Sequence, residues 1–428
     1  MDLNEPLPQT VVLADPRWDG HHPTYFFEFT ASLLRLGHRV MGLCREPEQF
    51  EKEARLICQR MGIDFETRVF AGQLNDPDKA YFRPGKDHDP VSTVMRWRCL
   101  KNAMDTAAKA SGYSADFVFL PWLDSYLRFQ PFTKLANQLG APWSGLYFRN
   151  HHFGENLNSI KKTAKGDRSL RNENLVAVGI LDERFTEIMA QESGKKIIAF
   201  PDITNEEKPE IPSPFALEMI KQAAGRKIIG MVSLEKRKGF LTMLKIAEAV
   251  RDQEDWFFVA AGKYAQDTCS QEEQAYVLSI QAKVKSGELT NIYLQLPGER
   301  VNDGADFNSL IKAFDVIYAA YEDFEGSSNA LTKGAIFERP LIATKGECVG
   351  GRVEEFGMGL TIEQGSVSEG EAAIRRVLAG EDWEGKPLQA RYADYHALHD
   401  RKKLDEVFAE LLQMGSLHLD SLSLAKGK

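Results

Sequence analysis

The sequence has few cysteines and no excess of basic residues. Its five cysteines among 428 residues are odd in number, far apart and never in a C-x-x-C pair, so neither a disulfide framework nor a structural zinc site is predicted. Free thiols fit a reducing compartment. Lys and Arg number 53 against 62 Asp and Glu, a net charge of −9, which argues against broad, sequence-independent nucleic-acid binding. This balance still allows a local basic pocket for phosphates.

The sequence also lacks a long apolar segment and an N-terminal targeting signal. Its longest apolar runs, such as 256–262 and 316–320, are far shorter than the about 20 residues of a membrane helix. Met1–Pro6 shows no basic region followed by an apolar core. We therefore expect a cytoplasmic protein without an integral membrane span, which leaves peripheral membrane association open.

Short apolar, β-rich runs alternate with amphipathic stretches almost from end to end. In the first half we predict strands at 10–14, 39–44, 64–70, 116–120, 143–148, 175–180 and 196–200. Helices are predicted between them at 24–36, 47–61, 91–110 and 182–191. Alternation of this kind predicts an α/β fold with parallel sheets covered by helices, the doubly wound architecture.

A polar segment with three prolines, residues 205–214, interrupts the alternation and is interpreted as a linker. The pattern then restarts, with strands predicted at 227–232, 256–261, 291–296, 315–319, 340–344 and 359–362. The sequence therefore predicts two Rossmann-like domains, 1–204 and 215–401. A tail helix at about 402–428 is long enough to pack back on the first domain.

The stretch 315–340 combines a buried strand, a loop and a helix. The loop ends in five residues: Glu325, Gly326, Ser327, Ser328 and Asn329. Gly326 and the serines leave backbone amides of the first helical turn open, and the helix dipole adds positive charge there, which suits a diphosphate. Glu325 is placed to accept hydrogen bonds from sugar hydroxyls. Simple capping by Ser327 or Ser328 explains the same residues, so both interpretations stand.

A basic loop follows the first predicted strand of the second half. Arg237 and Lys238 precede Gly239 where the strand ends and a helix begins. Cations at the carboxyl edge of an open α/β sheet suit phosphates. A solvated basic loop is the alternative.

The first predicted strand of the chain leads into a loop with Gly20, His21 and His22. The glycine lets a ligand approach the backbone, and the two imidazoles titrate near neutrality. The loop has no G-x-G-x-x-G pattern, which argues against an NAD dehydrogenase.

Taken in this order, the three loops and the linker resemble the GT-B glycosyltransferases of the retaining family-four type over nearly the whole chain. The most specific matches are Lys238-Gly239, Glu325-Gly326 and the strand Arg339-Pro340-Leu341-Ile342-Ala343-Thr344. The resemblance implies two Rossmann-like domains that face each other across a cleft. It also implies a nucleotide-sugar donor on the second domain, an acceptor on the first, and no metal or cofactor besides the donor as co-substrate.

Carried over by position, Lys238 and Glu325 are the candidate catalytic residues. Lys238, with Arg237, would neutralise the leaving diphosphate, an electrostatic role. Glu325 would hold sugar hydroxyls, and the amides of Gly326, Ser327, Ser328 and Asn329 would hold the phosphates. Gly20 would lie near the phosphates and the acceptor, and the candidate acceptor-binding residues are His21, His22 and His151.

Three positions depart from the family pattern. One is the arginine of the family's Gly-Arg-Leu stretch, where this chain has Val232-Ser233-Leu234. The family has a second glutamate eight positions after Glu325, which usually binds the nucleotide ribose, and this chain has Lys333 there. We include Lys333 among the donor-binding candidates because it could reach a phosphate. The histidine often found after the strand 116–118 is also missing, and Pro121-Trp122 stand in its place.

We therefore predict a retaining, metal-independent glycosyltransferase that transfers a sugar to a hydroxyl of a carbohydrate, lipid or small-molecule acceptor. Lys333 and the missing histidine keep a second hypothesis open, a catalytically degenerate GT-B module that binds a glycan or scaffolds a partner. A sugar-nucleotide epimerase is a third. Asp87-His88-Asp89 mimics a metal-binding triplet, but its Pro/Gly-rich surroundings predict a turn, so no metal site is predicted.

Overall fold

The computed structural model describes residues 8–18, 20–76, 90–127, 135–147, 170, 172–301 and 304–426. His151 and the triplet Asp87-His88-Asp89 lie outside the described residues. The chain divides into two compact units, which we call unit 1 (1–203 with 399–428) and unit 2 (204–398).

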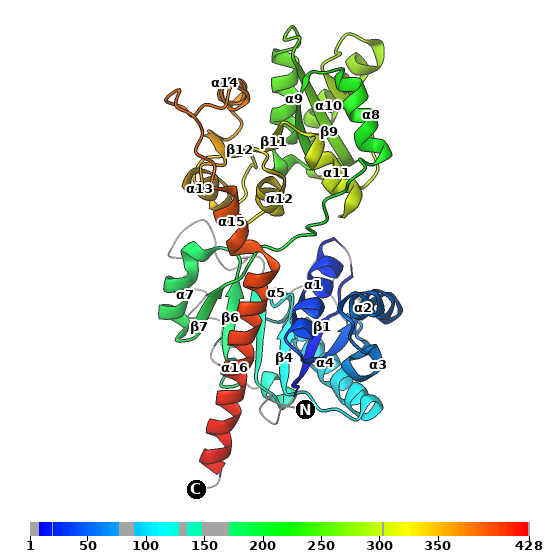
Figure 1. The fold of residues 1–428 in the computed structure, drawn as a ribbon, viewed down its shortest axis with the longest axis vertical. Helices are drawn as coiled ribbons and strands as arrows, with labels where there is room; N and C mark the ends of the chain where they lie inside the picture. Colours follow the sequence, from blue (N-terminus) through cyan, green and yellow to red (C-terminus); the bar gives the residue numbers. More distant parts are fainter. Residues whose placement is uncertain are drawn as a thin grey trace. The chain divides into compact units, whose positions relative to one another are not determined.

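Unit 1 contains a parallel seven-stranded sheet in the order β3-β2-β1-β4-β5-β6-β7 (Figure 1). Its strands are β1 (Thr10–Asp15), β2 (Arg39–Cys44), β3 (Val69–Gln73), β4 (Phe117–Leu120), β5 (Trp143–Tyr147), β6 (Ala177–Ile180) and β7 (Lys196–Ala199). Its helices are α1 (His22–Arg35), α2 (Pro47–Met61), α3 (Phe65–Arg68), α4 (Pro90–Ser111), α5 (Asp124–Leu127), α7 (Thr186–Ser193) and α16 (Arg401–Lys426). β1 pairs with both β2 and β4, so the strand order reverses between β1 and β4.

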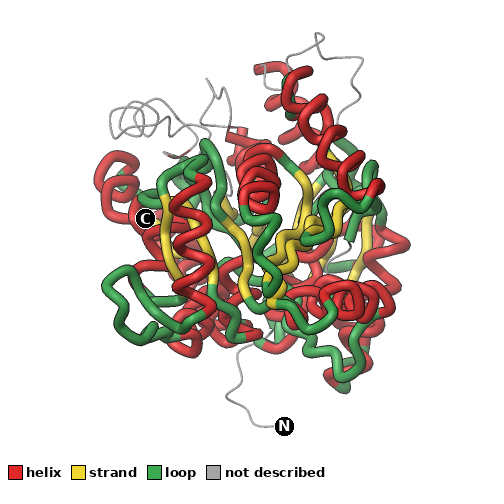
Figure 2. The backbone as a smooth tube through the Cα atoms, turned by 90° about the horizontal axis from the view of Figure 1, so that it is seen from above, coloured by secondary structure: helices red, strands yellow, loops and turns green. Residues whose placement is uncertain are grey.

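Unit 2 repeats this design with a parallel six-stranded sheet in the order β10-β9-β8-β11-β12-β13. Its strands are β8 (Lys227–Leu234), β9 (Trp256–Tyr264), β10 (Ile292–Leu294), β11 (Val316–Ala319), β12 (Leu341–Thr344) and β13 (Gly359–Ile362). Its helices are α8 (Pro214–Ala223), α9 (Phe240–Ala249), α10 (Gln271–Ser286), α11 (Ala305–Ala313), α12 (Asn329–Phe337), α13 (Cys348–Glu355), α14 (Val367–Leu378) and α15 (Tyr392–His399). Here the order reverses between β8 and β11, and helices lie on either side of the strands (Figure 2).

The predicted strand at 64–70 is wrong in its first half. Asp64 accepts a hydrogen bond from the backbone N–H of Glu66 and caps the short helix α3, so β3 begins only at Val69. Asp, Asn, Ser and Thr favour this local bond over a strand ladder.

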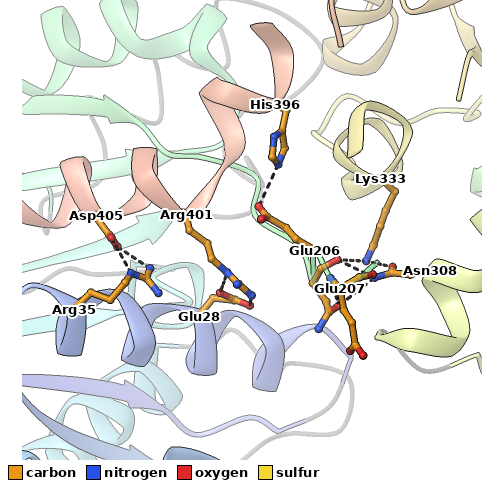
Figure 3. A network of polar contacts seen from close by, with 10 residues as sticks. Glu28, Arg35, Glu206, Glu207, Asn308, Lys333, His396, Arg401 and Asp405 are labelled. Atoms are coloured by element: carbon orange, nitrogen blue, oxygen red, sulfur yellow. Dashed lines mark hydrogen bonds and ion pairs between the residues drawn. The ribbon is translucent and has the colours of Figure 1, made fainter. Parts of the chain in front are cut away.

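The last helix, α16, packs on unit 1. The ring of Phe408 lies 5.4 Å from Phe29 of α1 and 4.9 Å from Phe119 of β4, between ring centroids. Two arginine–carboxylate pairs flank this apolar contact: Arg35 with Asp405, and Arg401 with Glu28 (Figure 3). Because Phe408 is fully buried, the tail is part of the core of unit 1.

The segment 205–213 contains no helix or strand and ends where Ser213 caps α8, its hydroxyl accepting from the N–H of Ala216. Its backbone is bonded to α11: the side-chain amide of Asn308 donates to the carbonyl oxygens of Asn205 and Glu207, at 3.2 and 2.7 Å. The predicted linker is therefore held on unit 2 along its first residues. Within the described chain, no helix is both long enough and apolar enough to cross a bilayer.

Candidate functional site

Open α/β sheets bind ligands at the carboxyl ends of their strands, where the strand order reverses. In unit 2 this point lies between the loop after β8 and the loop after β11. In unit 1 it lies between the loop after β1 and the segment after β4. Most of the described residues that the sequence singles out stand at these two points, whereas Lys333 lies further along α12.

The loop after β8 packs directly on the end of β11. Gly239 has φ +76°, and a Cβ there would lie 2.1 Å from the carbonyl oxygen of Ala320, so only glycine allows this approach. The carbonyl oxygen of Arg237 accepts a hydrogen bond from the N–H of Glu322 at 2.8 Å. The Arg237 guanidinium also lies 5.4 Å from the Phe324 ring centroid. The two loops are therefore side by side.

The carboxylate of Glu235 lies among the charged residues of the loop after β8. Its carboxylate accepts hydrogen bonds from the Ser233 hydroxyl and from Arg237 Nε, both at 2.8 Å. Burial alone would raise the pKa of Glu235, but Arg237, Ser233 and Lys238 together hold that pKa below its usual value. Lys236 pairs instead with Glu273 of α10, at 2.6 Å.

Lys238 differs from both neighbouring cations because no carboxylate forms an ion pair with it among the described residues. Its side chain is half-buried, and burial lowers the pKa of the Lys238 ammonium to about 8, a shift that the nearby Glu235 carboxylate opposes. A partly desolvated ammonium with no paired anion is a strong electrostatic partner for an anionic ligand.

The loop after β11 ends at α12, where Ser328 is the N-cap. Its hydroxyl accepts from the N–H of Ala330 at 3.3 Å and is bonded to the Tyr321 hydroxyl at 2.7 Å. The Ser327 hydroxyl accepts from Arg352 of α13, a buried side chain, at 2.6 Å. Ser328 therefore caps α12, as one of the two interpretations predicts. Glu325, Gly326 and Asn329 are half-buried around the start of the helix.

Lys333 lies on α12 but is completely buried. Its ammonium donates to the side-chain oxygen of Asn308 at 2.5 Å and to the carbonyl oxygen of Asn205 at 2.7 Å (Figure 3). Three segments of unit 2 therefore meet at this one ammonium: α12, α11 and the segment 205–213.

In unit 1, a buried Asp–His pair occupies the point where the sheet order reverses. Asp15 is the last residue of β1 and His22 the first of α1, and Asp15 Oδ2 lies 2.7 Å from His22 Nδ1. The His22 ring stacks on Trp122, which follows β4, with ring centroids 4.0 Å apart. Gly20 has φ +63° ahead of the helix, and His21, next to His22, is exposed.

The structure brings Arg237 and Lys238 beside the loop that carries Glu325 to Asn329. Four residues were missed by reasoning from the sequence: Asp15, Trp122, Phe324 and Arg352. A signal existed for Asp15, a carboxylate at the last position of an apolar strand. No pattern in the sequence points to Arg352, which lies 25 positions after its partner Ser327. Within the described residues, no group of three His, Cys, Asp or Glu side chains could hold a metal ion.

No protein-family model and no curated protein sequence matches the chain. Solved structures do. Trehalose-6-phosphate synthase OtsA superposes with a TM-score of 0.63 at 12% identity, over 95% of this chain and 99% of that one. HepE of Anabaena, in complex with UDP and glucose, gives 0.60 at 14% identity over 95% and 99%. Sucrose-phosphate synthase of Thermosynechococcus elongatus gives 0.56 at 14% identity over 97% and 100%.

The chain has the GT-B fold. The similarity covers both units and nearly the full length of each neighbour, which confirms the predicted α/β architecture of two Rossmann-like units. In a GT-B chain the two reversal points belong to two separate sheets, so each unit offers one ligand-binding edge.

Proposed function

We propose that this GT-B protein is a glycosyltransferase that moves a sugar from a nucleoside-diphosphate sugar to a hydroxyl of an acceptor, with retention and without a metal. The observation that carries the proposal is the reversal point of unit 2. There the Lys238 ammonium stands in a loop that packs, through Gly239, on the loop leading to the N-terminus of α12. The fold neighbours crystallised with UDP and with UDP-glucose support this type of donor.

The donor diphosphate would bind to the backbone amides of Gly326, Ser327, Ser328 and Asn329 at the start of α12. A helix N-terminus favours an anion through its open N–H groups and its dipole. Lys238, with Arg237 beside it, would neutralise the charge that develops on the leaving diphosphate. Glu325 would accept hydrogen bonds from hydroxyls of the transferred sugar.

The transfer step needs no protein nucleophile. The bond between the anomeric carbon and the diphosphate oxygen breaks, and its electron pair leaves with the diphosphate. The acceptor oxygen attacks the anomeric carbon from the same face, and its proton passes to the departing phosphate oxygen. Stabilising that oxygen, the role given to Lys238, is then the main task of the protein.

The acceptor would bind to unit 1, near Gly20 and the histidines His21, His22 and His151. A carbohydrate, a lipid or a small molecule with a free hydroxyl would serve. Lys333 is the donor-site candidate that this assignment does not use, because its ammonium is bonded to Asn308 and Asn205.

The test is to incubate the protein with a panel of UDP-, GDP- and ADP-sugars and follow release of the nucleoside diphosphate, with and without EDTA. We expect release with at least one donor, unchanged by EDTA, and a loss of about 100-fold or more in Lys238→Ala and Glu325→Ala. The matched control is Lys236→Ala, two positions away, whose lysine is paired with Glu273 and which should keep its activity. Absence of release with every donor, or unchanged turnover in both variants, refutes the assignment.

A further inference from the structure

The Asp15–His22 pair of unit 1 is more polar than packing alone requires. The side chains of His22 and Asp15 are 7% and 1% exposed. A buried carboxylate is unfavourable unless it is paired and hydrogen-bonded. Apolar side chains at both positions, with an aromatic ring at position 22 stacked on Trp122, would avoid that penalty. The fold therefore gains little from this pair, which points to a role in binding.

The contacts of Asp15 favour one tautomer of His22. Asp15 Oδ1 accepts a hydrogen bond from the backbone N–H of Arg17 at 2.9 Å, which leaves Oδ2 facing Nδ1 of His22 at 2.7 Å. An ionised carboxylate can only accept, so Nδ1 must carry the hydrogen. In the neutral imidazole, Nε2 is then a hydrogen-bond acceptor. Among the described residues, no side chain or backbone group forms a hydrogen bond with Nε2.

The position of the ring is also fixed. His22 is the first residue of α1, and its ring lies against Trp122 at an interplanar angle of 27°. Trp122 follows β4, in the stretch where the sequence lacks a histidine. His22 therefore brings an imidazole from β1–α1 to the end of β4, at the reversal point of the sheet.

We propose that His22 binds, through Nε2, an acceptor hydroxyl next to the one that attacks, and that Asp15 is a positioning residue that holds His22 in the accepting tautomer. This inference rests on the proposed glycosyl transfer and assigns its acceptor contact to one imidazole. Because the hydrogen bond to Nε2 comes from a neighbouring hydroxyl, the attacking hydroxyl keeps its own proton for the departing phosphate oxygen. The expected ligand is thus a neutral sugar or polyol hydroxyl.

The first test reads the tautomer directly. Long-range ¹H–¹⁵N spectra of the imidazoles, with the His22 signal assigned from His22→Gln, should show an Nδ1–H tautomer. Glucose added in the presence of UDP should shift the Nε2 resonance of His22. Asp15→Asn should change the tautomer because an amide N–H₂ can face Nδ1. An Nε2–H tautomer in the unsubstituted protein, or an Nε2 signal unmoved by glucose, overturns the inference.

The second test separates transfer from donor hydrolysis, with glucose as the acceptor probe and the best donor of the panel. His22→Gln and Asp15→Asn should lower transfer to glucose about 10- to 100-fold, through a higher acceptor KM or a lower kcat for transfer. Hydrolysis of the donor by water, the donor KM and the melting temperature should change little.

The matched control is His38→Gln, the same substitution in the same unit. His38 precedes β2 and accepts a hydrogen bond from the N–H of Gln9 at 3.3 Å. It lies at the amino ends of the strands, whereas His22 lies at their carboxyl ends. If His22→Gln lowers transfer no more than His38→Gln, the inference about His22 fails while the proposed function stands. If the unsubstituted protein releases no nucleoside diphosphate from any donor, the proposed function itself fails.

Discussion

The ammonium of Lys333 lies 2.5 Å from the side-chain oxygen of Asn308, in the interior of unit 2. Asn308 in turn donates to the carbonyl oxygens of Asn205 and Glu207. One buried cation thus ties α12 and α11 to the segment through which the chain passes from unit 1 into unit 2. The lysine at the position where the resemblance predicts a glutamate has a clear structural role.

Replacing Lys333 with Met should destabilise unit 2. The substitution leaves the Asn308 side-chain oxygen without the Lys333 donor and removes one of the two donors to the Asn205 carbonyl oxygen. An unsatisfied buried group lowers the free energy of unfolding by about 1–3 kcal/mol. We expect a fall in melting temperature of at least about 4 °C, measured by differential scanning calorimetry.

The control for this change is Lys312→Met. Lys312 also bonds the same segment, donating to the carbonyl oxygen of Pro209 at 3.0 Å, but it does so at the surface. Exposed contacts of this kind contribute little, so the melting temperature should change by about 1 °C or less. Equal effects of the two substitutions would show that burial of Lys333 is not what matters.

Binding of a nucleoside diphosphate should draw a proton onto Lys238 near pH 8.5. The pKa of this ammonium is lowered to about 8, so much of it is neutral at pH 8.5, and a bound diphosphate favours the charged form. Calorimetric titration with UDP in Tris and in HEPES, whose ionisation enthalpies differ, measures the proton uptake. Uptake should be clear at pH 8.5, fall toward zero at pH 6.5, and vanish in Lys238→Met.

The lowered pKa of Lys238 also determines how the free energy of unfolding changes with pH. Because the pKa of Lys238 falls from 10.5 to about 8 on folding, the unfolded chain binds more protons between these two pH values. The free energy of unfolding should therefore gain a contribution that rises with pH across this window. Urea titrations of the free protein at pH 7.5 and pH 10 measure it, and Lys238→Met should lose this contribution. An identical pH dependence in both proteins would contradict the lowered pKa.

Gly239→Ala should separate the two loops of the unit 2 site. The new Cβ would lie 2.1 Å from the Ala320 carbonyl oxygen, so the backbone of one loop must move. We expect UDP affinity, measured by calorimetry, to fall at least about 10-fold, because the amides of α12 and Lys238 then lose their mutual placement.

Gly37→Ala is the control for the left-handed backbone alone. Gly37 has φ +82°, and a Cβ there would meet nothing within 4 Å. Alanine in this conformation lowers the free energy of unfolding by about 1–2 kcal/mol and should leave UDP affinity unchanged. Similar losses of affinity in both variants would argue against a specific role for the Gly239 contact.

Phe408→Ala should strongly destabilise unit 1. The ring is fully buried and lies among Phe29, Phe119 and Phe200, at centroid distances of 4.9–5.8 Å. Removing a buried phenylalanine ring lowers the free energy of unfolding by about 3–5 kcal/mol, as urea unfolding would measure. Leu417→Ala on the same helix, at a side chain that is 61% exposed, should change it by less than about 0.5 kcal/mol. A small effect of Phe408→Ala would mean that the tail does not contribute to the core.

The strands could be predicted because buried parallel strands are nearly continuous apolar runs. The run 39–44 coincides with β2, and 10–14 differs from β1 by one residue. The prediction failed at Asp64, where a side chain caps the local backbone and turns the start of a predicted strand into α3. The loops that follow β8 and β11 could likewise be found, since a strand end and a helix start mark them.

The partners of the polar side chains could not be predicted. Lys333 is bonded to residues 25 and 128 positions away, and periodicity carries no information over that distance. His21 and His22 are neighbours in the same loop, so composition cannot rank them. Only the helical periodicity of α1 distinguishes the two histidines, because His22 lies on the same buried face of the helix as Phe26, Phe29 and Leu33.

Because the chain returns to unit 1 after unit 2, producing unit 1 on its own requires both parts of its sequence. Unit 2 is one uninterrupted stretch, 204–398, set into the sequence of unit 1. The two points of excision adjoin, since the N–H of Asp202 donates to Nδ1 of His399 at 2.9 Å. A short linker of glycines and serines could thus join Ile203 to His399 and give a shortened protein that keeps α16 on unit 1. An N-terminal fragment that ends at Ile203 would lack α16 and expose the aromatic rings that Phe408 covers.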